Sequence, residues 1–243
     1  MSASNPPRRS RFFAVFTLLL LLIVFWGFAR TLYLKAFFEV PELPGHLYVH
    51  GFVLTAWFLL LFCQTWLIQT KRVQIHRRLG IGGSVLAVAV VAVSVWTLVR
   101  RDLPAIDEFP NRAAPNLVSL VVFSLCVGSA ILLRKRSAAH KRLMLLGSIV
   151  ITAPALDRVA RLPPIQGLVE AVLPSVIFPP EAWFGLLVVL SMFLAIAVHD
   201  IATRGRPHVA TISGVLSLFV AAPAIVAALT LSGMWSAFVR WVG

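Results

Sequence analysis

The stretch FFAVFTLLLLLIVFWGFA at residues 12–29 decides the fold class, because it contains no Asp, Glu, Lys or Arg. A helix needs about 20 mainly apolar residues to cross a bilayer, and about 17 suffice. Five other runs of this kind follow, at 43–70, 79–99, 113–133, 182–199 and 207–239. The run 143–156 is shorter and reaches span length only if Asp157 and Arg158 join its end. We therefore predict an all-α polytopic membrane protein with seven transmembrane helices.

The composition excludes several classes of protein. The 243 residues are 59% hydrophobic and 13% charged, whereas a soluble domain is about 25% charged. A soluble globular enzyme, a disordered chain and a coiled coil are therefore excluded, and a transmembrane barrel would need alternating strands. The net charge of +13 comes from basic residues between the apolar runs. It predicts a lipid bilayer as the partner and no nucleic acid.

We predict that residues 1–243 form a single transmembrane domain of a lead helix and three helical hairpins. The helices are expected near 12–29, 47–70, 79–99, 115–133, 141–158, 182–202 and 209–231. Three turns repeat an Arg-x-x-x-His pattern, at Arg72/His76, Arg136/His140 and Arg204/His208. Pro223 should kink the last helix. The proline-rich loop 157–181 is expected to be an extracytoplasmic connection, with a re-entrant lid as the alternative.

The distribution of basic residues predicts the orientation. Of the 22 Lys and Arg residues, 14 lie in the N-terminal segment and the three repeated turns. Short cytoplasmic loops carry an excess of Lys and Arg. We therefore expect a protein of the bacterial inner (cytoplasmic) membrane, with the N-terminus cytoplasmic and the C-terminus extracytoplasmic.

Several motifs carry a resemblance to known proteins: His46-x-x-x-His50-Gly51, Trp57, Gln64 and His76-Arg77-Arg78-Leu79-Gly80. With these motifs the chain resembles a broad group of uncharacterised bacterial multi-pass membrane proteins that share an H-R-x-x-G helix-turn motif. This resemblance implies a helical membrane fold and no particular activity. A looser likeness to cytochrome b561-type proteins implies haem between histidines of neighbouring helices. The chain departs from that pattern, because no span has a histidine at each end.

One group of candidate cofactor-binding residues lies on a single predicted helix and comprises His46, His50 and Gln64. His46 and His50 are four residues apart, a spacing that lets two imidazoles chelate a metal or contact a haem. His50, Trp57 and Gln64 follow at intervals of seven and share one helix face. We expect this face, with His50, to point into the bundle, because hydrocarbon cannot satisfy polar groups.

Asp157 is predicted near the same membrane depth as His46 and His50. One interpretation makes its carboxylate the group that orients these histidines in a polar pocket. The alternative is an ordinary interfacial acid that pairs with Arg158 or Arg161, while the histidines are ordinary interface residues.

A second group is expected on the cytoplasmic side and comprises the candidate metal ligands His76, His140, His208 and Asp200. We predict that the three histidines lie at one depth and that at least two are close enough to share a ligand. We expect the cytoplasmic end of the bundle to be surrounded by three arginines, Arg72, Arg136 and Arg204. Asp200 should pair with one of them or orient a histidine. The alternative is a set of ordinary polar helix starts at the lipid headgroups, which also include His199.

Three functions remain open from the sequence, and no residue is designated catalytic. The first is a redox role with haem b or a divalent metal. The second is a metal-dependent membrane lipid hydrolase, which would need three protein ligands. The third is a non-enzymatic assembly or transport component, working as a homo-oligomer or within a membrane complex. Whether the protein is an enzyme stays open.

Overall fold

The computed structural model describes residues 11–102, 110–173, 175, 179–232 and 237. Within these ranges the regular structure is entirely helical. Six helices are long and apolar enough to cross a membrane, and a bent pair makes a seventh span. Apolar side chains face outward, and Val88, Leu125 and Val220 are 69%, 65% and 60% exposed. The protein is therefore a multi-pass α-helical membrane protein, as predicted.

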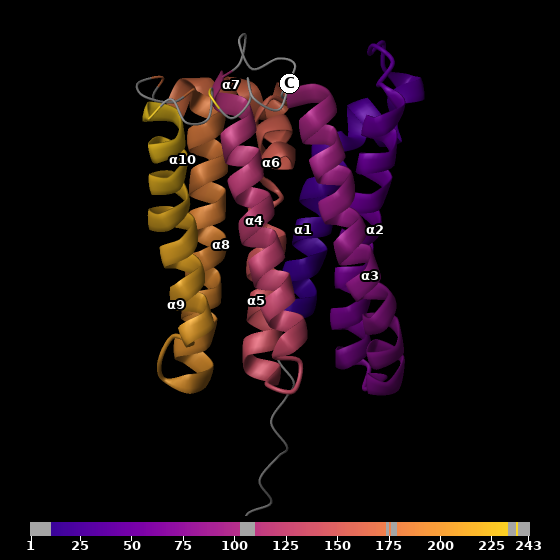
Figure 1. The fold of residues 1–243 in the computed structure, drawn as a ribbon, viewed down its shortest axis with the longest axis vertical. Coiled ribbons are helices and arrows are strands. Elements are labelled where there is room, and N and C mark those ends of the chain that lie inside the picture. Colours follow the sequence, from indigo (N-terminus) through magenta and orange to yellow (C-terminus); the bar gives the residue numbers. More distant parts are fainter. Residues whose placement is uncertain (1–10, 103–109, 174, 176–178, 233–236, 238–243) are drawn as a thin grey trace, which may run out of the picture.

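The helices run roughly parallel to one another (Figure 1). They are α1 (Phe12–Phe28), α2 (Gly45–Gln69), α3 (Val73–Thr97), α4 (Pro110–Leu132), α5 (Ser137–Val150), α6 (Ala153–Ala160), α7 (Pro163–Val172), α8 (Pro180–Arg204), α9 (Val209–Leu216) and α10 (Ala222–Leu231). The turns α2–α3, α4–α5 and α8–α9 lie together at one end, which we call the inner end. The opposite end, with α6 and α7, is the outer end. The lead helix and three hairpins are thus confirmed.

The lead helix α1 is the central element. In its apolar window 44% of the residues are buried, against 11% in α2 and in α3. Its buried residues include Phe16, Leu20 and Val24. Thr17 Oγ1 lies 2.7 Å from Thr65 Oγ1 of α2. Because α1 contacts both α2 and α6, it joins the first hairpin to the second.

The fifth span is a bent pair rather than one straight helix. α5 and α6 meet at an angle of 49°. Pro154 stands in the first turn of α6, where its ring cannot continue an α-helix from the preceding turn. Gly27 of α1 makes room for α6, because a Cβ at Gly27 would lie only 2.5 Å from the Ala155 carbonyl oxygen. The backbones of α1 and α6 therefore touch.

Two further details refine the predictions. The last span is not sharply broken at Pro223: a π-helical segment, η4 (Ser217–Ala221), links α9 to α10, because Pro223 supplies no N–H for the regular helical bond. The loop predicted at 157–181 contains the end of α6 and all of α7, which contacts α6 and α8. Two short helices therefore replace the plain connection that we expected.

Candidate functional site

The structure brings together two of the predicted inner histidines from different hairpins. His76 lies in the first turn of α3 and His140 in the first turn of α5. Their ring centroids are 6.4 Å apart and their planes cross at 85°. Both side chains are half-buried. We call this pair the inner histidine pair.

A hydrogen bond fixes the tautomer of His140. Its Nδ1 lies 2.8 Å from the carbonyl oxygen of Ala130 in α4. A carbonyl can only accept, so Nδ1 carries the hydrogen, and in the neutral ring Nε2 keeps the lone pair. Metal-binding histidines are commonly held in this way, with the second ring nitrogen donating to a carbonyl or carboxylate. The α4–α5 hairpin thus prepares His140 Nε2 as a ligand atom.

Gln64 lies at this inner end with the histidine pair. It is 18 residues after His46 on α2, or about 27 Å away along the helix. Its side-chain nitrogen is close to Gly80 of α3, where a Cβ would lie 3.8 Å from it. Gln64 Oε1 and His76 Nδ1 are both buried and have no hydrogen-bond partner. Gln64 therefore cannot share a small ligand with His46 and His50, but its backbone forms a hydrogen bond with His76.

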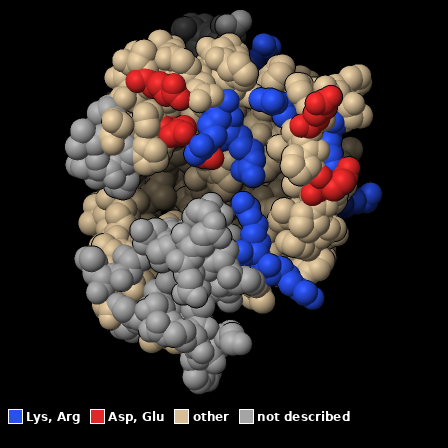
Figure 2. Space-filling view, turned by 90° about the horizontal axis from the view of Figure 1, so that it is seen from above, with Lys and Arg blue, Asp and Glu red and all other residues tan. Residues whose placement is uncertain are grey.

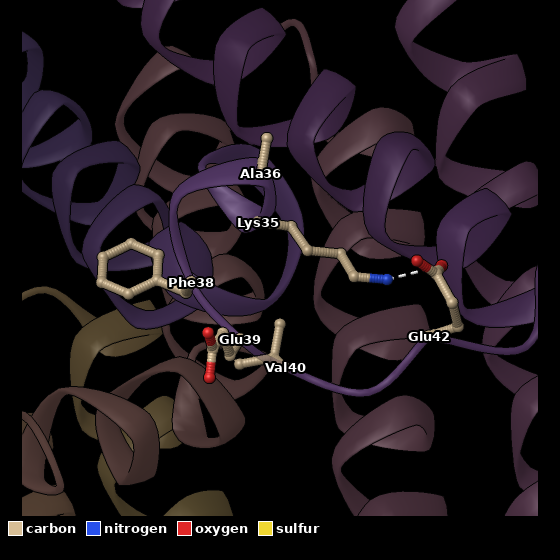
Figure 3. Close-up of a pocket in the computed structure, with 6 residues that line it drawn as sticks. All are labelled: Lys35, Ala36, Phe38, Glu39, Val40 and Glu42. Carbon is tan, nitrogen blue, oxygen red and sulfur yellow. Dashed lines mark ion pairs between the residues drawn. The ribbon is translucent and has the colours of Figure 1, made fainter.

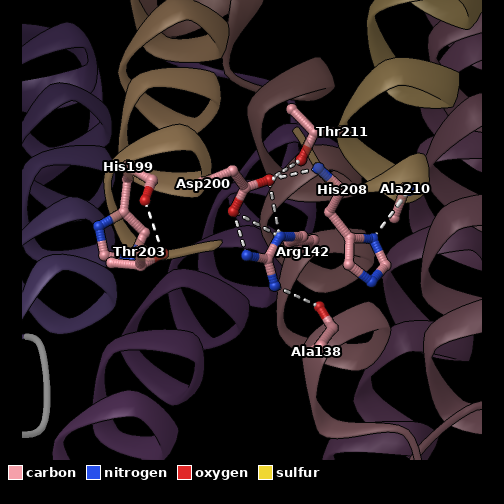
Figure 4. A network of polar contacts seen from close by, with 8 residues as sticks. All are labelled: Ala138, Arg142, His199, Asp200, Thr203, His208, Ala210 and Thr211. Carbon is pink, nitrogen blue, oxygen red and sulfur yellow. Dashed lines mark hydrogen bonds and ion pairs between the residues drawn. The ribbon is translucent and has the colours of Figure 1, made fainter. Parts of the chain in front are cut away.

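Asp200 lies at the centre of a buried polar network at the inner end (Figure 4). Arg142, only 1% exposed, donates to its carboxylate through Nε at 2.9 Å and through Nη2. Thr211 Oγ1 donates at 2.7 Å and the His208 main-chain N–H at 3.0 Å. Arg142 Nη1 donates to the Ala138 carbonyl oxygen at 2.7 Å. Both buried charges are therefore well satisfied, and the network joins α5 to α8 and α9.

The partner of Asp200 differs from the prediction. We expected Asp200 to pair with Arg72, Arg136 or Arg204 or to orient a histidine. All three arginines are exposed at the inner turns, and the contact of Asp200 with His208 is to the main-chain N–H. Arg142 lies inside α5, two residues after His140. Residues two apart on a helix point to opposite sides, so His140 faces α3 while Arg142 faces α8. The spacing of two residues in His140-Lys141-Arg142 was the sequence signal that could have indicated Arg142 as the partner of Asp200.

The structure does not bring the four predicted metal ligands together in one group. His208 Nδ1 accepts a hydrogen bond from the Ala210 N–H at 3.0 Å and caps α9. Burial lowers the pKa of His208, and the nearby Arg142 guanidinium lowers this pKa further. In the part of the chain that the structure describes, no three His, Cys, Asp or Glu residues could hold a metal ion. His208 and Asp200 thus belong to the polar network and not to the inner histidine pair.

His199, also expected at this depth, makes a packing contact. Its ring stacks on Phe12 with centroids 4.1 Å apart and planes 2° apart. Lys141 Nζ lies 4.3 Å from the ring centroid of Phe13. The start of α1 therefore rests on α5 and α8 next to the polar network.

The face of α2 that carries His46, His50 and Trp57 is partly confirmed. Trp57 points into the bundle: it is 3% exposed, and its Nε1 donates to Ser148 Oγ at 3.1 Å. His50 is half-buried. The His46 ring lies 5.8 Å from that of Trp96, and His46 Nε2 is buried with no hydrogen-bond partner. These two histidines stay a candidate group, separate from Gln64.

The predicted orienting role of Asp157 is not what the structure shows. Asp157 accepts a hydrogen bond from Arg161 at 3.1 Å, one turn along the chain. Arg161 also lies 3.2 Å from Glu181. The interfacial ion pair, which was the alternative, is therefore correct.

An open pocket of about 600 Å³ lies in the segment between α1 and α2 (Figure 3). Its lining includes Lys35 and Glu42, whose side chains form an ion pair at 2.5 Å. The Tyr48 hydroxyl accepts from Lys35 at 2.9 Å and donates to Glu42 at 3.0 Å. Hydrogen bonding to Glu42 raises the pKa of Lys35, and hydrogen bonding to Lys35 lowers the pKa of Glu42. Lys35, Glu42 and Tyr48 therefore satisfy one another, and Glu39 is the other charged residue of the lining.

Comparisons with known proteins add no relative. The chain matches no protein-family model, no curated protein and no solved structure.

Proposed function

We propose that this protein binds haem b at the inner end of the bundle, that His76 and His140 would hold it, and that the haem would supply a redox role. The observation that carries the proposal is the tautomer of His140, which the Ala130 carbonyl sets so that Nε2 keeps its lone pair. The second support is His76 Nδ1, which is buried and has no hydrogen-bond partner.

The spacing of the two rings favours haem iron over a hydrolytic zinc site. Metal–nitrogen bonds of about 2 Å place two opposed imidazoles with their centroids about 6 Å apart, close to the observed 6.4 Å. Haem iron commonly takes histidine ligands, so these two residues would suffice to hold it, and the haem would supply electron transfer. A catalytic zinc needs three protein ligands, and the described residues contain no such set. The lipid hydrolase is therefore the weaker candidate.

We further propose the bacterial inner membrane as the location, with the inner end cytoplasmic. This orientation is supported by the 14 Lys and Arg residues of the N-terminal segment and the three inner turns, against 8 elsewhere. Exposed cations near the pair, such as Arg77, would suit the anionic propionate groups of a haem. A reporter fused after residue 72 should be active only in its cytoplasmic form, and activity in the opposite form would contradict the orientation.

The experiment is purification from haem-supplemented cells, followed by absorbance and metal analysis of the same sample. We expect a Soret band and about one iron per chain in the wild type. The variants H76A and H140A should lose most of this haem, while the control H208A, outside the pair, should keep it. Wild-type protein without a Soret band, or equal haem in all three variants, would overturn the proposal. A stoichiometric metal without a Soret band would show that the protein binds a metal ion and not haem.

A further inference from the structure

The motif His46-x-x-x-His50 is not used by the proposed haem site. Among the six histidines of the chain, only these two are four residues apart. Both belong to α2, which is an α-helix from Gly45 to Gln69. Residues four apart on a helix share one face, with their Cβ atoms about 5–6 Å apart. Two imidazoles in this arrangement can bind one metal ion.

His46 packs against α3 and is partly enclosed. Its ring centroid lies 5.8 Å from that of Trp96, and the two ring planes cross at 59°. His46 Nε2 is buried and has no hydrogen-bond partner among the described residues. Most buried polar atoms have such a partner, so an exception needs an explanation. An ordinary interfacial histidine would turn this nitrogen to water, whereas a metal ion would use it as a ligand atom.

The outer half of α2 is fixed on two sides. On one side Gly51 packs against Leu32 of η1 (Ala29–Tyr33), because a Cβ at Gly51 would lie only 2.7 Å from a methyl carbon of Leu32. On the other side Trp57 is buried and donates to Ser148 of α5. Two ligands on a helix that is already held in place lose little freedom when they bind an ion.

The charges of the molecule favour a cation at this end. Seen from above, the outer end carries Asp and Glu side chains on either side of a band of Lys and Arg (Figure 2). Among the described acids only Asp200 lies at the inner end, and those at the outer end are Glu39, Glu42, Asp157, Glu170 and Glu181. Since opposite charges attract, these carboxylates make the outer end the better place for a divalent cation.

We infer that His46 and His50 together bind a divalent transition-metal ion at the outer end. Imidazole suits Zn²⁺, Ni²⁺ and Cu²⁺, whereas Mg²⁺ and Ca²⁺ prefer oxygen ligands. Two histidines can hold such an ion without the three protein ligands of a catalytic zinc. The site lies at the opposite end of the bundle from the inner histidine pair, and the inference does not depend on haem binding.

The test follows the thermal unfolding midpoint of the full-length protein in detergent, purified with a tag that contains no histidine and freed of metal by a chelator. Ni²⁺ or Zn²⁺ is titrated into H76A/H140A, which lacks the inner pair, and Mg²⁺ is the control ion. We expect Ni²⁺ or Zn²⁺ to raise the midpoint in a saturable way and Mg²⁺ to have no effect. Adding H46A/H50A to this protein should increase the ion concentration needed at least about tenfold, because loss of a group that merely orients a metal ligand already costs about 10–100-fold in affinity.

A matched control keeps the number of histidines on α2. In the same background, H50A/F52H moves one ring to a position six residues from His46, on another face of the helix. Phe52 is 60% exposed, so this variant remains informative if the protein without His46 and His50 does not fold. It should respond as weakly as that protein, and H76Q/H140Q is the background if H76A/H140A does not fold. The inference is overturned if neither ion raises the midpoint of the background protein, or if moving or removing the outer histidines leaves the response unchanged.

Discussion

Two arginines, Arg142 at the inner end and Arg158 at the outer end, are both withdrawn from water but have different partners. Arg142 is 1% exposed and shares its charge with Asp200 and the Ala138 carbonyl. Arg158 lies on Phe28 and has no carboxylate partner among the described residues. Removing the partner of a buried, paired cation leaves an uncompensated charge, whereas a half-buried cation without a carboxylate partner leaves none when it is replaced. The predictions below test this difference.

The largest effect is expected when the ion pair between Arg142 and Asp200 is broken. Replacing Asp200 by Ala leaves Arg142 buried without a counter-charge, which costs about 3–5 kcal/mol of unfolding free energy. The free energy can be measured by SDS titration in mixed micelles. R158M should cost much less, because no internal carboxylate loses its partner.

A double variant separates charge from packing at the same place. R142M/D200L replaces both charges by apolar groups of similar size, and such replacements are often neutral. We expect it to recover most of the stability lost in D200A. A double variant as unstable as D200A would mean that the network contributes through more than the ion pair.

The next effect tests how the outer end is positioned. Gly27→Ala adds a methyl group 2.5 Å from the Ala155 carbonyl oxygen, so α1 and α6 must separate. We expect a loss of about 1–3 kcal/mol, typical of overpacking. Gly82→Ala is the matched control, since nothing lies within 4 Å of its Cβ position. Equal stability of the two variants would contradict the close contact.

A smaller effect is expected from the bond between Trp57 and Ser148. Trp57→Phe keeps most of the ring and removes the donor to Ser148 Oγ, at a cost of about 1 kcal/mol. The variants W57F, S148A and W57F/S148A form a double-mutant cycle that isolates this bond. Strictly additive losses would show that the two side chains do not interact.

The smallest effect concerns pH and His208. Burial lowers the pKa of His208, so the unfolded chain takes up a proton before the folded one. Stability is then complete above about pH 6.5 and is partly lost as the pH falls below that value. His208→Asn keeps an acceptor for the Ala210 N–H and should flatten this part of the pH profile. An unchanged profile would assign the dependence to another group.

The sequence predicted the fold well because span length and charge are local properties. The uncharged run 12–29 and the basic turns at 71–78 and 134–142 define helices and hairpins without any knowledge of their packing. The bend at Pro154 and the π-helical segment before Pro223 were harder to predict from the sequence, because a helix can accommodate a proline in several backbone conformations.

The candidate sites were predicted only in part, because they depend on which helix faces meet. The Arg-x-x-x-His repeat correctly placed His76 and His140 at one end. The repeat did not show that Asp200 would pair with Arg142, because this pairing depends on which side of α5 packs against α8. The residue type of His208 did not reveal that its Nδ1 caps α9.

The central claim, that His76 and His140 are opposed ligands of one haem iron, is tested most directly by the electron paramagnetic resonance spectrum of the oxidised protein. Two axial imidazoles should give a low-spin ferric signal in the wild type. Removing either ring in H76A or H140A should convert any retained haem to a high-spin signal, while H208A stays low-spin. A wild type without a low-spin signal, or one that both H76A and H140A preserve, would contradict the account.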